Sequence, residues 1–414
     1  MIKLLSLFSG IGAFEAALRR GGYQFETVNY CEIDPYASKA YSQIHGISED
    51  FNLHDVRTVN PLLMNNVNLV TFGFPCQDIS VAGKQKGFEH DGERTRSGLF
   101  FEALRIIEFL QPEYAICENV KALTSKKFEK EFNTVLSSLA EVGYNNYWQV
   151  LNAKDYGIPQ NRERVFIISI RKDIDTGAFT FPEKQELKLR VKDMLEPVVD
   201  EKYYIDNERS RNLIRQITAK FDLGGGIAVS DGTIKDPKVK DVSNTIKARY
   251  DCGIENQKSV GCMVLEPVTI KRLGNLYDEN AGGSYAGNVY DPNGLAPTIR
   301  TAQGGGLQPH ILINPDVCGN DVCRTIKSQY HKTSTANFER TGTQGATGVL
   351  DVTNHRIRKL TPRECFRLMG FTDDDFDKIK GISNTQLYKM AGNSIVVNVL
   401  EAIFKQLFKE TNKE

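Results

Sequence analysis

The sequence predicts an α/β protein with a doubly wound, mainly parallel sheet and a second, smaller domain that is rich in glycine and β-strands. The first 170 residues alternate short β-rich runs with helical patterns, which favours a sheet of this kind. Eighteen of the 34 glycines fall between Gly224 and Gly348, where helical periodicity is scarce. A chain of 414 residues is also too long for one compact core, so we expect at least two domains.

The expected elements of the first domain follow in chain order. Ile2–Phe8 is a strand, and Gly12–Arg20 is a helix that Gly21 and Gly22 end. The next strand, Thr27–Glu32, leads to a helix that begins at Pro35, because proline suits a first helical position. Further buried strands are expected at Leu69–Phe72, Tyr114–Cys117 and Val165–Ile170, and further helices at Leu99–Leu110 and Phe128–Val142.

Regular structure is expected again near the C-terminus. Thr361-Pro362-Arg363-Glu364 has the pattern of a capping box with proline at the first helical position, which predicts a short helix as far as Met369. An amphipathic helix is expected from about Ser394 to Phe408.

Bulk composition excludes several classes of protein. The 52 basic and 52 acidic residues balance, so composition gives no sign of nucleic-acid binding. No run of eighteen apolar residues is present, and the first fifteen residues are typical of a strand and turn rather than a signal peptide. We therefore expect a cytoplasmic protein that does not enter the membrane.

The stretch GFPCQDIS, Gly73 to Ser80, places Cys76 after a proline at the end of an apolar run. Packing, a disulfide, a metal ligand and a nucleophile are the four roles open to this thiol. None of the eight cysteines forms a Cys-x-x-Cys pair, and the spacing of Cys318 and Cys323 does not suit a zinc knuckle. No metal site is expected, and packing and nucleophile remain as the roles of Cys76.

Polar residues at strand ends mark one edge of the predicted sheet. FSGIGAFE, Phe8 to Glu15, is a glycine turn that allows a ligand to approach the start of a helix, although it lacks the third glycine of a dinucleotide motif. Glu32 ends the second strand and Asp55 ends the next extended segment. Carboxylates in such places can bind a ribose and an adenine amine.

The same edge receives the groups that could do chemistry. Cys76 follows what we count as the fourth strand, and Glu118 of ENV ends the next one. Arg162 and Arg164 come from QNRERVF, Gln160–Phe166. No histidine is near them in sequence, so a Cys–His pair of the protease kind has no support.

Together these motifs resemble those of the DNA cytosine-5 methyltransferase family over nearly the whole chain. The ordered motifs are FSGIGAFE, GFPCQ, ENV, QNRER, RKLTPRECFRLMGF and GNSIVVNVL. One of them alone would mean little, whereas six in the family order exclude chance. The resemblance implies a Rossmann-like methyltransferase fold that uses S-adenosylmethionine.

The resemblance also implies catalytic roles. Cys76 would attack carbon-6 of cytosine and so make carbon-5 nucleophilic, and Glu118 would hydrogen-bond the exocyclic amine and ring nitrogen-3. Arg164 would bind the ring oxygen. Arg162 would support either Glu118 or the cofactor side.

Cofactor and DNA contacts follow from the family in the same way. Along adenosylmethionine we expect Phe8, Gly10, Gly12, Glu32 on the ribose, Asp55 near adenine, and Asn393 with Ser394 from GNSIVVNVL. The loop after Cys76, with Gln77 and Ser80, is expected to contact DNA and to close over a base flipped out of the duplex.

The glycine-rich segment resembles a family target-recognition region. It has three Thr-Ile dipeptides in similar contexts, which begin at Thr245, Thr298 and Thr325, and these three threonines are expected to contact DNA. Repeated recognition modules would explain them. A single enlarged recognition domain is the alternative.

The resemblance predicts a discontinuous catalytic domain, 1–186 plus 392–414, a target-recognition domain, 187–355, and a hinge, 356–391. Expected partners are double-stranded DNA, bound by a monomer, and a cognate restriction endonuclease within a restriction-modification system. A tRNA cytosine-5 methyltransferase and a catalytically silent DNA-binding relative stay open as alternatives.

Overall fold

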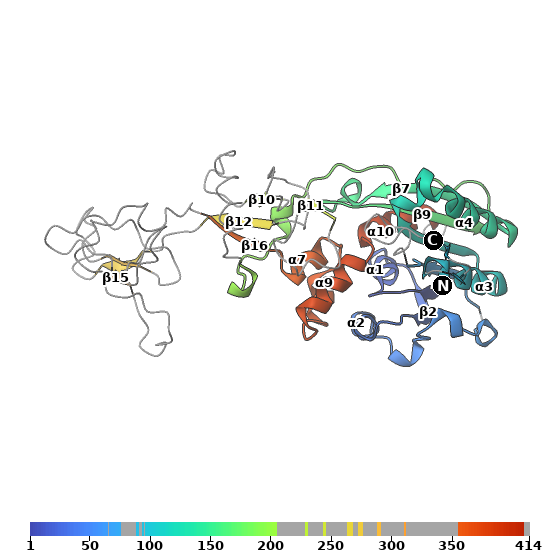
Figure 1. The fold of residues 1–414 in the computed structure, drawn as a ribbon, viewed down its shortest axis with the longest axis horizontal. Helices are drawn as coiled ribbons and strands as arrows, with labels where there is room; N and C mark the ends of the chain where they lie inside the picture. The colour runs from blue at the N-terminus through green and yellow to red at the C-terminus, as the bar shows by residue number, and fades with distance from the viewer. Residues whose placement is uncertain are drawn as a thin grey trace. The chain divides into compact units, whose positions relative to one another are not determined.

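The computed structural model describes residues 1–64, 66–75, 88–90, 93–94, 96–204, 228–230, 243–245, 263–267, 272–275, 288–290, 310–311 and 355–409. The chain divides into two compact units (Figure 1). The first consists of Met1–Tyr203, Val229–Met263 and Lys359–Glu414, and the second of Tyr204–Ala228 and Val264–Arg358.

A six-stranded sheet in the order β2-β1-β3-β6-β9-β7 forms the centre of the first unit. Its strands are β1 (Ile2–Leu7), β2 (Phe25–Cys31), β3 (Leu69–Phe72), β6 (Tyr114–Val120), β7 (Tyr144–Asn152) and β9 (Glu163–Arg171). The pairs β1–β2, β1–β3 and β3–β6 are parallel, and β9 is antiparallel to both neighbours. The mainly parallel α/β sheet is therefore confirmed, with one reversed strand.

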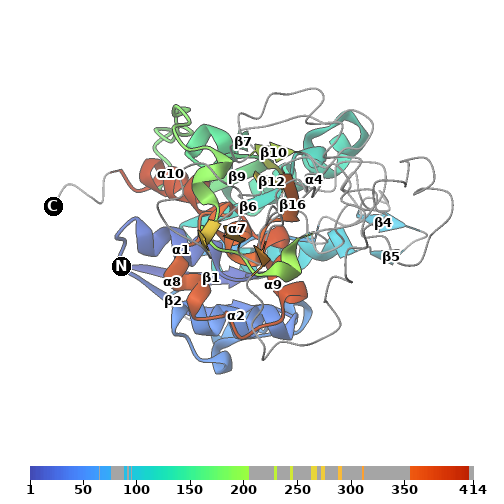
Figure 2. The same cartoon turned by 90° about the vertical axis from the view of Figure 1, so that its left-hand side faces the viewer.

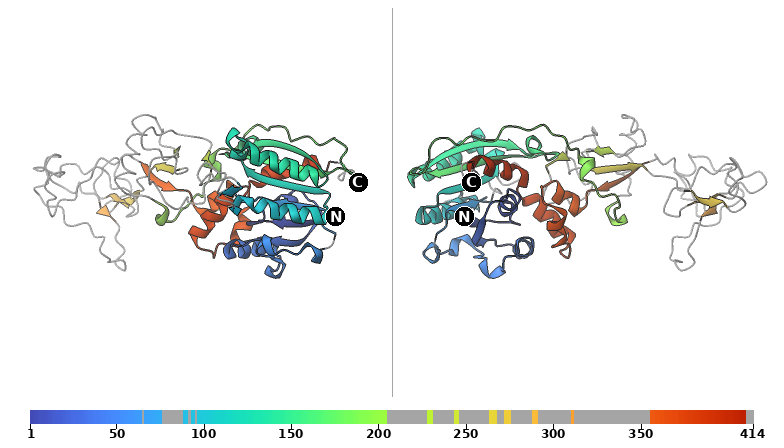
Figure 3. Two further views of the ribbon diagram at one scale, coloured as in Figure 1. Left: turned by 45° about the vertical axis from the view of Figure 1, so that its right-hand side comes forward. Right: turned by 180° about the vertical axis from the view of Figure 1, so that it is seen from behind.

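Helices cover both faces of this sheet, as Figure 3 shows. They are α1 (Ala13–Arg20), α2 (Pro35–His45), α3 (Phe100–Leu110), α4 (Glu129–Glu141) and α10 (Val397–Leu407). One core joins alternate strand residues such as Val70 and Cys117 to Ile107 of α3 and Leu139 of α4, all at most 1% exposed. On the other face α1 packs against α10, where the rings of Phe14 and Phe404 meet edge to face. None of the helices among the described residues is long and apolar enough to cross a membrane.

Local signals explain where several helices begin. The side chain of Asp34 accepts hydrogen bonds from the amides of Tyr36 and Ala37, and Pro35 occupies the first helical position of α2. The Thr361–Glu364 capping box is present and begins α7 (Pro362–Arg367). Two further helices complete this region, α8 (Asp373–Asp377) and α9 (Asn384–Asn393). Figure 2 shows these C-terminal elements, in red, next to the N-terminal elements, in blue.

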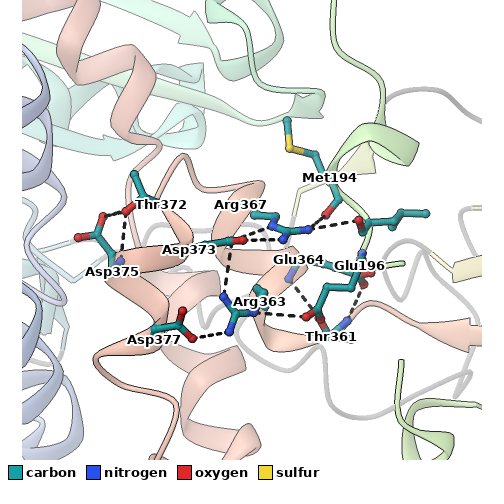
Figure 4. Close-up of polar contacts among 11 residues, drawn as sticks. Met194, Glu196, Thr361, Arg363, Glu364, Arg367, Thr372, Asp373, Asp375 and Asp377 are labelled. Atoms are coloured by element: carbon teal, nitrogen blue, oxygen red, sulfur yellow. Dashed lines mark hydrogen bonds and ion pairs between the residues drawn. The ribbon is translucent and has the colours of Figure 1, made fainter. Parts of the chain in front are cut away.

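Side chains of α7 and α8 hold the segment Met194–Glu196, as Figure 4 shows. Arg367 forms a two-pronged ion pair with Asp373, with N–O distances of 2.8 and 2.7 Å, and donates to the carbonyl of Met194. The Glu364 carboxylate accepts from the amide of Glu196 at 2.8 Å. Within the first unit, this network joins the chain before Tyr203 to the chain after Lys359.

Three sequence predictions need correction. The extended segment directly before Asp55 is not a strand, since only an isolated bridge joins Asn52 to Tyr30. Asp55 caps a 3₁₀ turn at Val56–Thr58, where its carboxylate accepts from the amide of Arg57. Leu69–Phe72 is therefore the third strand in chain order, not the fourth. The edge strand β7 is absent from the predicted elements, because its polar sequence YNNYWQVLN lacks a buried strand's apolar run.

The bounds of two C-terminal helices also differ from the prediction. The first ends at Arg367 rather than Met369, and the last begins at Val397 rather than Ser394. Ser394 is extended, and its carbonyl accepts a hydrogen bond from Arg162.

The remaining described strands are short. They are β4 (Glu89–His90), β5 (Glu93–Arg94), β8 (Gln160–Asn161), β10 (Ala228–Ser230), β11 (Ser243–Asn244), β12 (Met263–Pro267), β13 (Arg272–Asn275), β14 (Asn288–Tyr290), β15 (His310–Ile311) and β16 (His355–Lys359). Three-stranded sheets form in the orders β10-β12-β16 and β13-β14-β15. The domain boundaries predicted from the sequence stay a prediction.

Candidate active site

Glu118 and Arg164 meet at the edge of the sheet where the parallel strands end. In the antiparallel pairing of β6 with β9, Arg164 lies opposite Val120, two residues beyond Glu118, so both side chains are on one face. Arg164 Nε lies 3.0 Å from Glu118 Oε1, and the two side chains are 18% and 12% exposed. Because β9 runs opposite to the parallel strands, Arg164, near the start of β9, lies at their carboxyl ends.

Burial raises the pKa of Glu118, although Arg164 and Arg162 act in the opposite direction. A carboxyl group with a raised pKa holds a proton more readily near neutral pH than an exposed one does. Glu118 can therefore both donate and accept a hydrogen bond in the course of a reaction.

The segment Gly73–Pro75 lies against Glu118. Asn119 is 2% exposed, and its side-chain amide donates to the carbonyl of Phe74 at 3.1 Å. A Cβ atom built on Gly73 would lie 3.5 Å from Glu118 Oε2. The chain is thus held beside Glu118 at Gly73 and Phe74, and Phe74 is two residues before Cys76. Cys76 itself, Gln77 and Ser80 lie outside the described residues.

Arg162 lies behind this pair and is 3% exposed. Its Nη2 donates to the carbonyls of Gly392, at 3.1 Å, and Ser394, at 2.7 Å. The sequence left two roles open for Arg162, support of Glu118 and support of the cofactor side. These two hydrogen bonds are to the GNS turn, Gly392–Ser394, which is on the expected cofactor side. Its charge also lowers the pKa of Glu118.

The first glycine turn and Glu32 form a second polar cluster at the same edge. Glu32 Oε2 accepts from the amide of Gly10 at 2.9 Å, and Oε1 accepts from the amide of Asp34 at 2.7 Å. Burial raises the pKa of Glu32 against these two hydrogen bonds. Phe8, Gly10 and Gly12 have φ angles of 53°, 57° and 77°. The turn therefore has the backbone that its glycines predict, and Phe8 adopts the same left-handed region with a side chain.

Two observations fit a ligand at this turn. Ser9 Oγ is buried, and no described residue forms a hydrogen bond with it. A Cβ atom built on Gly10 would have nothing within 4 Å, so the turn borders open space. Open space at Gly10, next to the half-buried carboxylate of Glu32 and with a Ser9 hydroxyl in the same turn that has no partner among the described residues, suits a ligand with hydroxyl and amino groups. The residues present therefore fit adenosylmethionine.

At Gly12, unlike at Gly10, neighbouring atoms leave no room for a side chain. A Cβ atom there would come 2.1 Å from His45 Nε2, the atom that hydrogen-bonds the carbonyl of Ile11 at 3.0 Å. His45 thus packs directly under the turn, and only glycine leaves room for it.

Asp55 is 24% exposed and points to its own turn. Its carboxylate accepts from the amide and from the guanidinium of Arg57, and these contacts lower its pKa. The structure therefore gives Asp55 a strong local partner that an adenine amine would have to share.

Asn393 and Ser394 end α9. Asn393 is exposed, whereas Ser394 is 7% exposed and its hydroxyl contacts the carbonyl of Ile395 at 3.3 Å. Sequence patterns identified this turn, but they did not identify Asn52, which is 6% exposed and bonds both backbone groups of Glu32. An isolated asparagine three residues before Asp55 has no motif that would have marked it.

The first of the three recognition threonines lies beside the catalytic segment. Strand β11 pairs in parallel with β8, and the Thr245 hydroxyl donates to the carbonyl of Asn161 at 2.8 Å. Asn161 directly precedes Arg162. Thr298 and Thr325 lie outside the described residues.

Comparison with known proteins identifies the family. The family model described as C-5 cytosine-specific DNA methylase matches residues 2–409. The orphan methyltransferase M.SPRI of Bacillus phage SPR is 33% identical, over 100% of this chain and 99% of its own length. The type II methyltransferase M.HhaI of Haemophilus parahaemolyticus is 31% identical, over 97% of this chain and 93% of its own length.

Two solved structures share the fold. The Entamoeba histolytica methyltransferase EhMeth aligns with a TM-score of 0.61 at 18% identity, covering 100% of this chain and 99% of that one. The S. pombe Dnmt2 methyltransferase aligns with a TM-score of 0.56 at 20% identity and covers both chains completely. The chain therefore belongs to the C-5 cytosine-specific DNA methylase family, and it is a DNA cytosine-5 methyltransferase.

Proposed function

We propose that the protein transfers a methyl group from S-adenosylmethionine to carbon-5 of a cytosine that has been flipped out of duplex DNA. The observation that supports this most directly is the Glu118–Arg164 pair, 3.0 Å apart, beside the segment that leads to Cys76. A largely buried acid and a guanidinium at that position match the two polar edges of a cytosine ring, which must leave the base stack to reach them.

The chemistry begins with Cys76. Its thiolate attacks carbon-6, and the new sulfur–carbon bond pushes electron density toward carbon-5 and nitrogen-3. Glu118 delivers a proton to nitrogen-3, which its raised pKa favours, and Arg164 binds the ring oxygen. S-adenosylmethionine, when bound, supplies the methyl group for carbon-5. Loss of the carbon-5 proton to a base, for which water suffices, then expels the Cys76 thiolate, and nitrogen-3 returns its proton to Glu118.

The cofactor site in this proposal consists of the glycine turn and the two carboxylates. Glu32 accepts hydrogen bonds from the ribose hydroxyls, and its contacts with the amides of Gly10 and Asp34 hold it in place. Asp55 lies near the adenine. Arg162 keeps the turn that contains Asn393 and Ser394 at the same edge.

Target selection belongs to the glycine-rich region between residues 187 and 355, with Thr245, Thr298, Thr325, Gln77 and Ser80 among the DNA contacts. Residues 1–186 and 392–414 form the catalytic domain, and 356–391 the hinge. We propose that the protein acts as a monomer in the cytoplasm, within a restriction-modification system or as an orphan methyltransferase.

Trapping on 5-fluorocytosine DNA tests the proposal. Fluorine cannot leave carbon-5 as a cation, so the covalent adduct should persist on gels with wild-type protein and S-adenosylmethionine. Cys76→Ser should form none, because an alcohol is a far weaker nucleophile than a thiolate. Duplex DNA and tRNA substrates run in parallel distinguish the two cytosine-5 activities. A persistent adduct in Cys76→Ser, or adducts on tRNA alone, would refute the proposed reaction.

A further inference from the structure

Asn52 joins the two segments that end in Glu32 and Asp55. Its side-chain Oδ1 accepts from the backbone amide of Glu32 at 3.0 Å and from that of His54 at 2.8 Å. Its Nδ2 donates to the Glu32 carbonyl at 2.9 Å and to the Ser38 hydroxyl at 2.8 Å. Because backbone amides can only donate, the orientation of the Asn52 amide is set by its surroundings.

The contacts with Glu32 fix its backbone from both sides. With its amide and its carbonyl both bound to one side chain, Glu32 cannot rotate without breaking a buried hydrogen bond. With the backbone in this position, its carboxylate accepts from the amides of both Gly10 and Asp34. Asn52 therefore orients a carboxylate that it does not touch.

The contact with His54 acts on the second segment. His54 has a φ angle of 56°, a left-handed conformation that is unfavourable for a residue with a Cβ atom. The hydrogen bond from the His54 amide to Asn52 closes this turn, and the next residue is Asp55. Without Asn52, the chain before Asp55 would lose the contact that holds its unfavourable backbone.

We propose that Asn52 is a positioning residue for the cofactor, which presents the Glu32 and Asp55 carboxylates together in the absence of a ligand. The inference rests on the proposed function, in which these two carboxylates bind S-adenosylmethionine. Both a donor and an acceptor are needed at this position. Aspartate keeps the two acceptor contacts but cannot donate to the Glu32 carbonyl, and it adds a negative charge next to Glu32.

Cofactor binding to the DNA-free protein, measured by isothermal titration calorimetry, tests this inference. Asn52→Ala should raise the Kd for S-adenosylmethionine at least tenfold, and Asn52→Asp at least threefold. Asn146→Ala is the matched control, because Asn146 lies on β7 at the other edge of the sheet, where its side chain donates to the Leu136 carbonyl at 2.9 Å and accepts from Ser169 Oγ at 2.6 Å. Its Kd should stay within twofold of wild type.

Two further readouts separate positioning from general loss of structure. In Asn52→Ala, kcat at saturating cofactor and the KM for DNA should stay within twofold, while amide hydrogen exchange at Gly10 and Asp34 becomes faster. Adding His54→Gly to Asn52→Ala should recover at least threefold in affinity, because glycine adopts a positive φ without strain. General destabilisation would not be repaired by that second change.

The outcomes that overturn the inference are distinct from failure of the proposed function. Glu32→Ala, measured in parallel, tests the cofactor site itself. If Glu32→Ala weakens binding and Asn52→Ala matches Asn146→Ala, the positioning role is wrong and the site stands. If Asn52→Ala fails to fold, Asn52→Asp decides, and wild-type affinity in that variant overturns the inference.

Discussion

The Arg164 guanidinium and the Glu118 carboxyl group contact each other across two neighbouring antiparallel strands, with Nε and Oε1 3.0 Å apart. In the proposed reaction, a cytosine bound beside them would take over these contacts, since its ring oxygen accepts and its amine donates. The pair therefore keeps both groups in one place before the base arrives, which avoids reorganisation at the moment of reaction.

Glu118→Gln should lower the single-turnover methylation rate by about 10²–10⁴-fold, the usual contribution of a positioned acid. A neutral amide can hydrogen-bond cytosine but cannot share a proton with nitrogen-3. The affinity for duplex DNA should change far less, because phosphate contacts supply most of it. Rapid-quench methylation and a DNA-binding titration at fixed salt measure the two quantities.

Glu163→Gln is the matched control for that experiment. Glu163 lies on the same strand next to Arg164, but its carboxylate pairs with Lys121 at 2.9 Å and is 42% exposed. Surface pairs of this kind contribute little, so its rate should stay within about twofold of wild type. Equal rates in Glu118→Gln and Glu163→Gln would remove the acid role from Glu118.

Arg162→Lys should weaken cofactor binding and lower stability together. Nη2 of Arg162 donates to the carbonyls of both Gly392 and Ser394, and the nitrogen of a lysine side chain ends one atom short of that position. Losing hydrogen bonds from a buried charged group costs about 1.5–3 kcal/mol. Thermal unfolding and cofactor titration measure both effects. Arg171→Lys, at the other end of β9, should lower stability without changing the cofactor Kd, and the same Kd in both variants would contradict the assignment.

The sequence predicted those parts of the fold that depend on local signals. Thr361 and Glu364 form the capping box that their spacing predicts, and Pro35 begins its helix where expected. Asp55 was misplaced because a carboxylate at a strand end and one that caps a 3₁₀ turn leave the same trace in sequence. The direction of β9 follows from pairing between segments far apart in the chain, which no local pattern encodes.

The site was predictable to a similar extent. Residues within motifs, such as Glu118 and Arg164, meet in the structure. The hydrogen bonds from Arg162 to the GNS turn could not be inferred, because they depend on how residues 162 and 394 pack. Asn52 and His45 act on motif residues from outside any motif, so only the contacts identify them.

His45 should make stability depend on pH below neutrality. Burial, with the charges of Arg19 and Lys378, lowers the pKa of His45 from 6.5 to about 4, while Asp375 and the hydrogen bond to Ile11 oppose this. Between these values the unfolded chain binds a proton that the folded protein does not, so the free energy of unfolding falls as pH drops from 6.5 to 4. The full effect is about 3 kcal/mol, and none of it appears above pH 7.

His45→Gln measures this contribution, because glutamine can donate to the Ile11 carbonyl but does not titrate. Urea unfolding at pH 7.5 and pH 4.5 should show a smaller pH-dependent loss in the variant than in wild type. Carboxyl groups titrate equally in both proteins and cancel in the difference. An identical loss in the two proteins would show that His45 is not held neutral.

The three Thr-Ile segments should read different DNA sequences if each belongs to its own recognition module. Base-edge contacts are local, and each good pair contributes about 1–3 kcal/mol of discrimination. Alanines at Thr298-Ile299-Arg300 or at Thr325-Ile326-Lys327 should therefore each remove one methylated motif and spare the others. Genome-wide bisulfite sequencing of cells that express each variant measures this directly.

The segment at Thr245 needs a different design, because its hydroxyl bonds the Asn161 carbonyl next to Arg162. Thr245→Ala could lower methylation of every motif by loosening the catalytic segment, which would hide a loss of reading. Ile246-Lys247 should be replaced instead, with Thr245→Ala as the matched variant. We expect loss of one motif from the first change and a uniform decrease from the second. A single methylated motif in wild type, weakened by all the changes, would exclude repeated modules and leave one enlarged recognition domain.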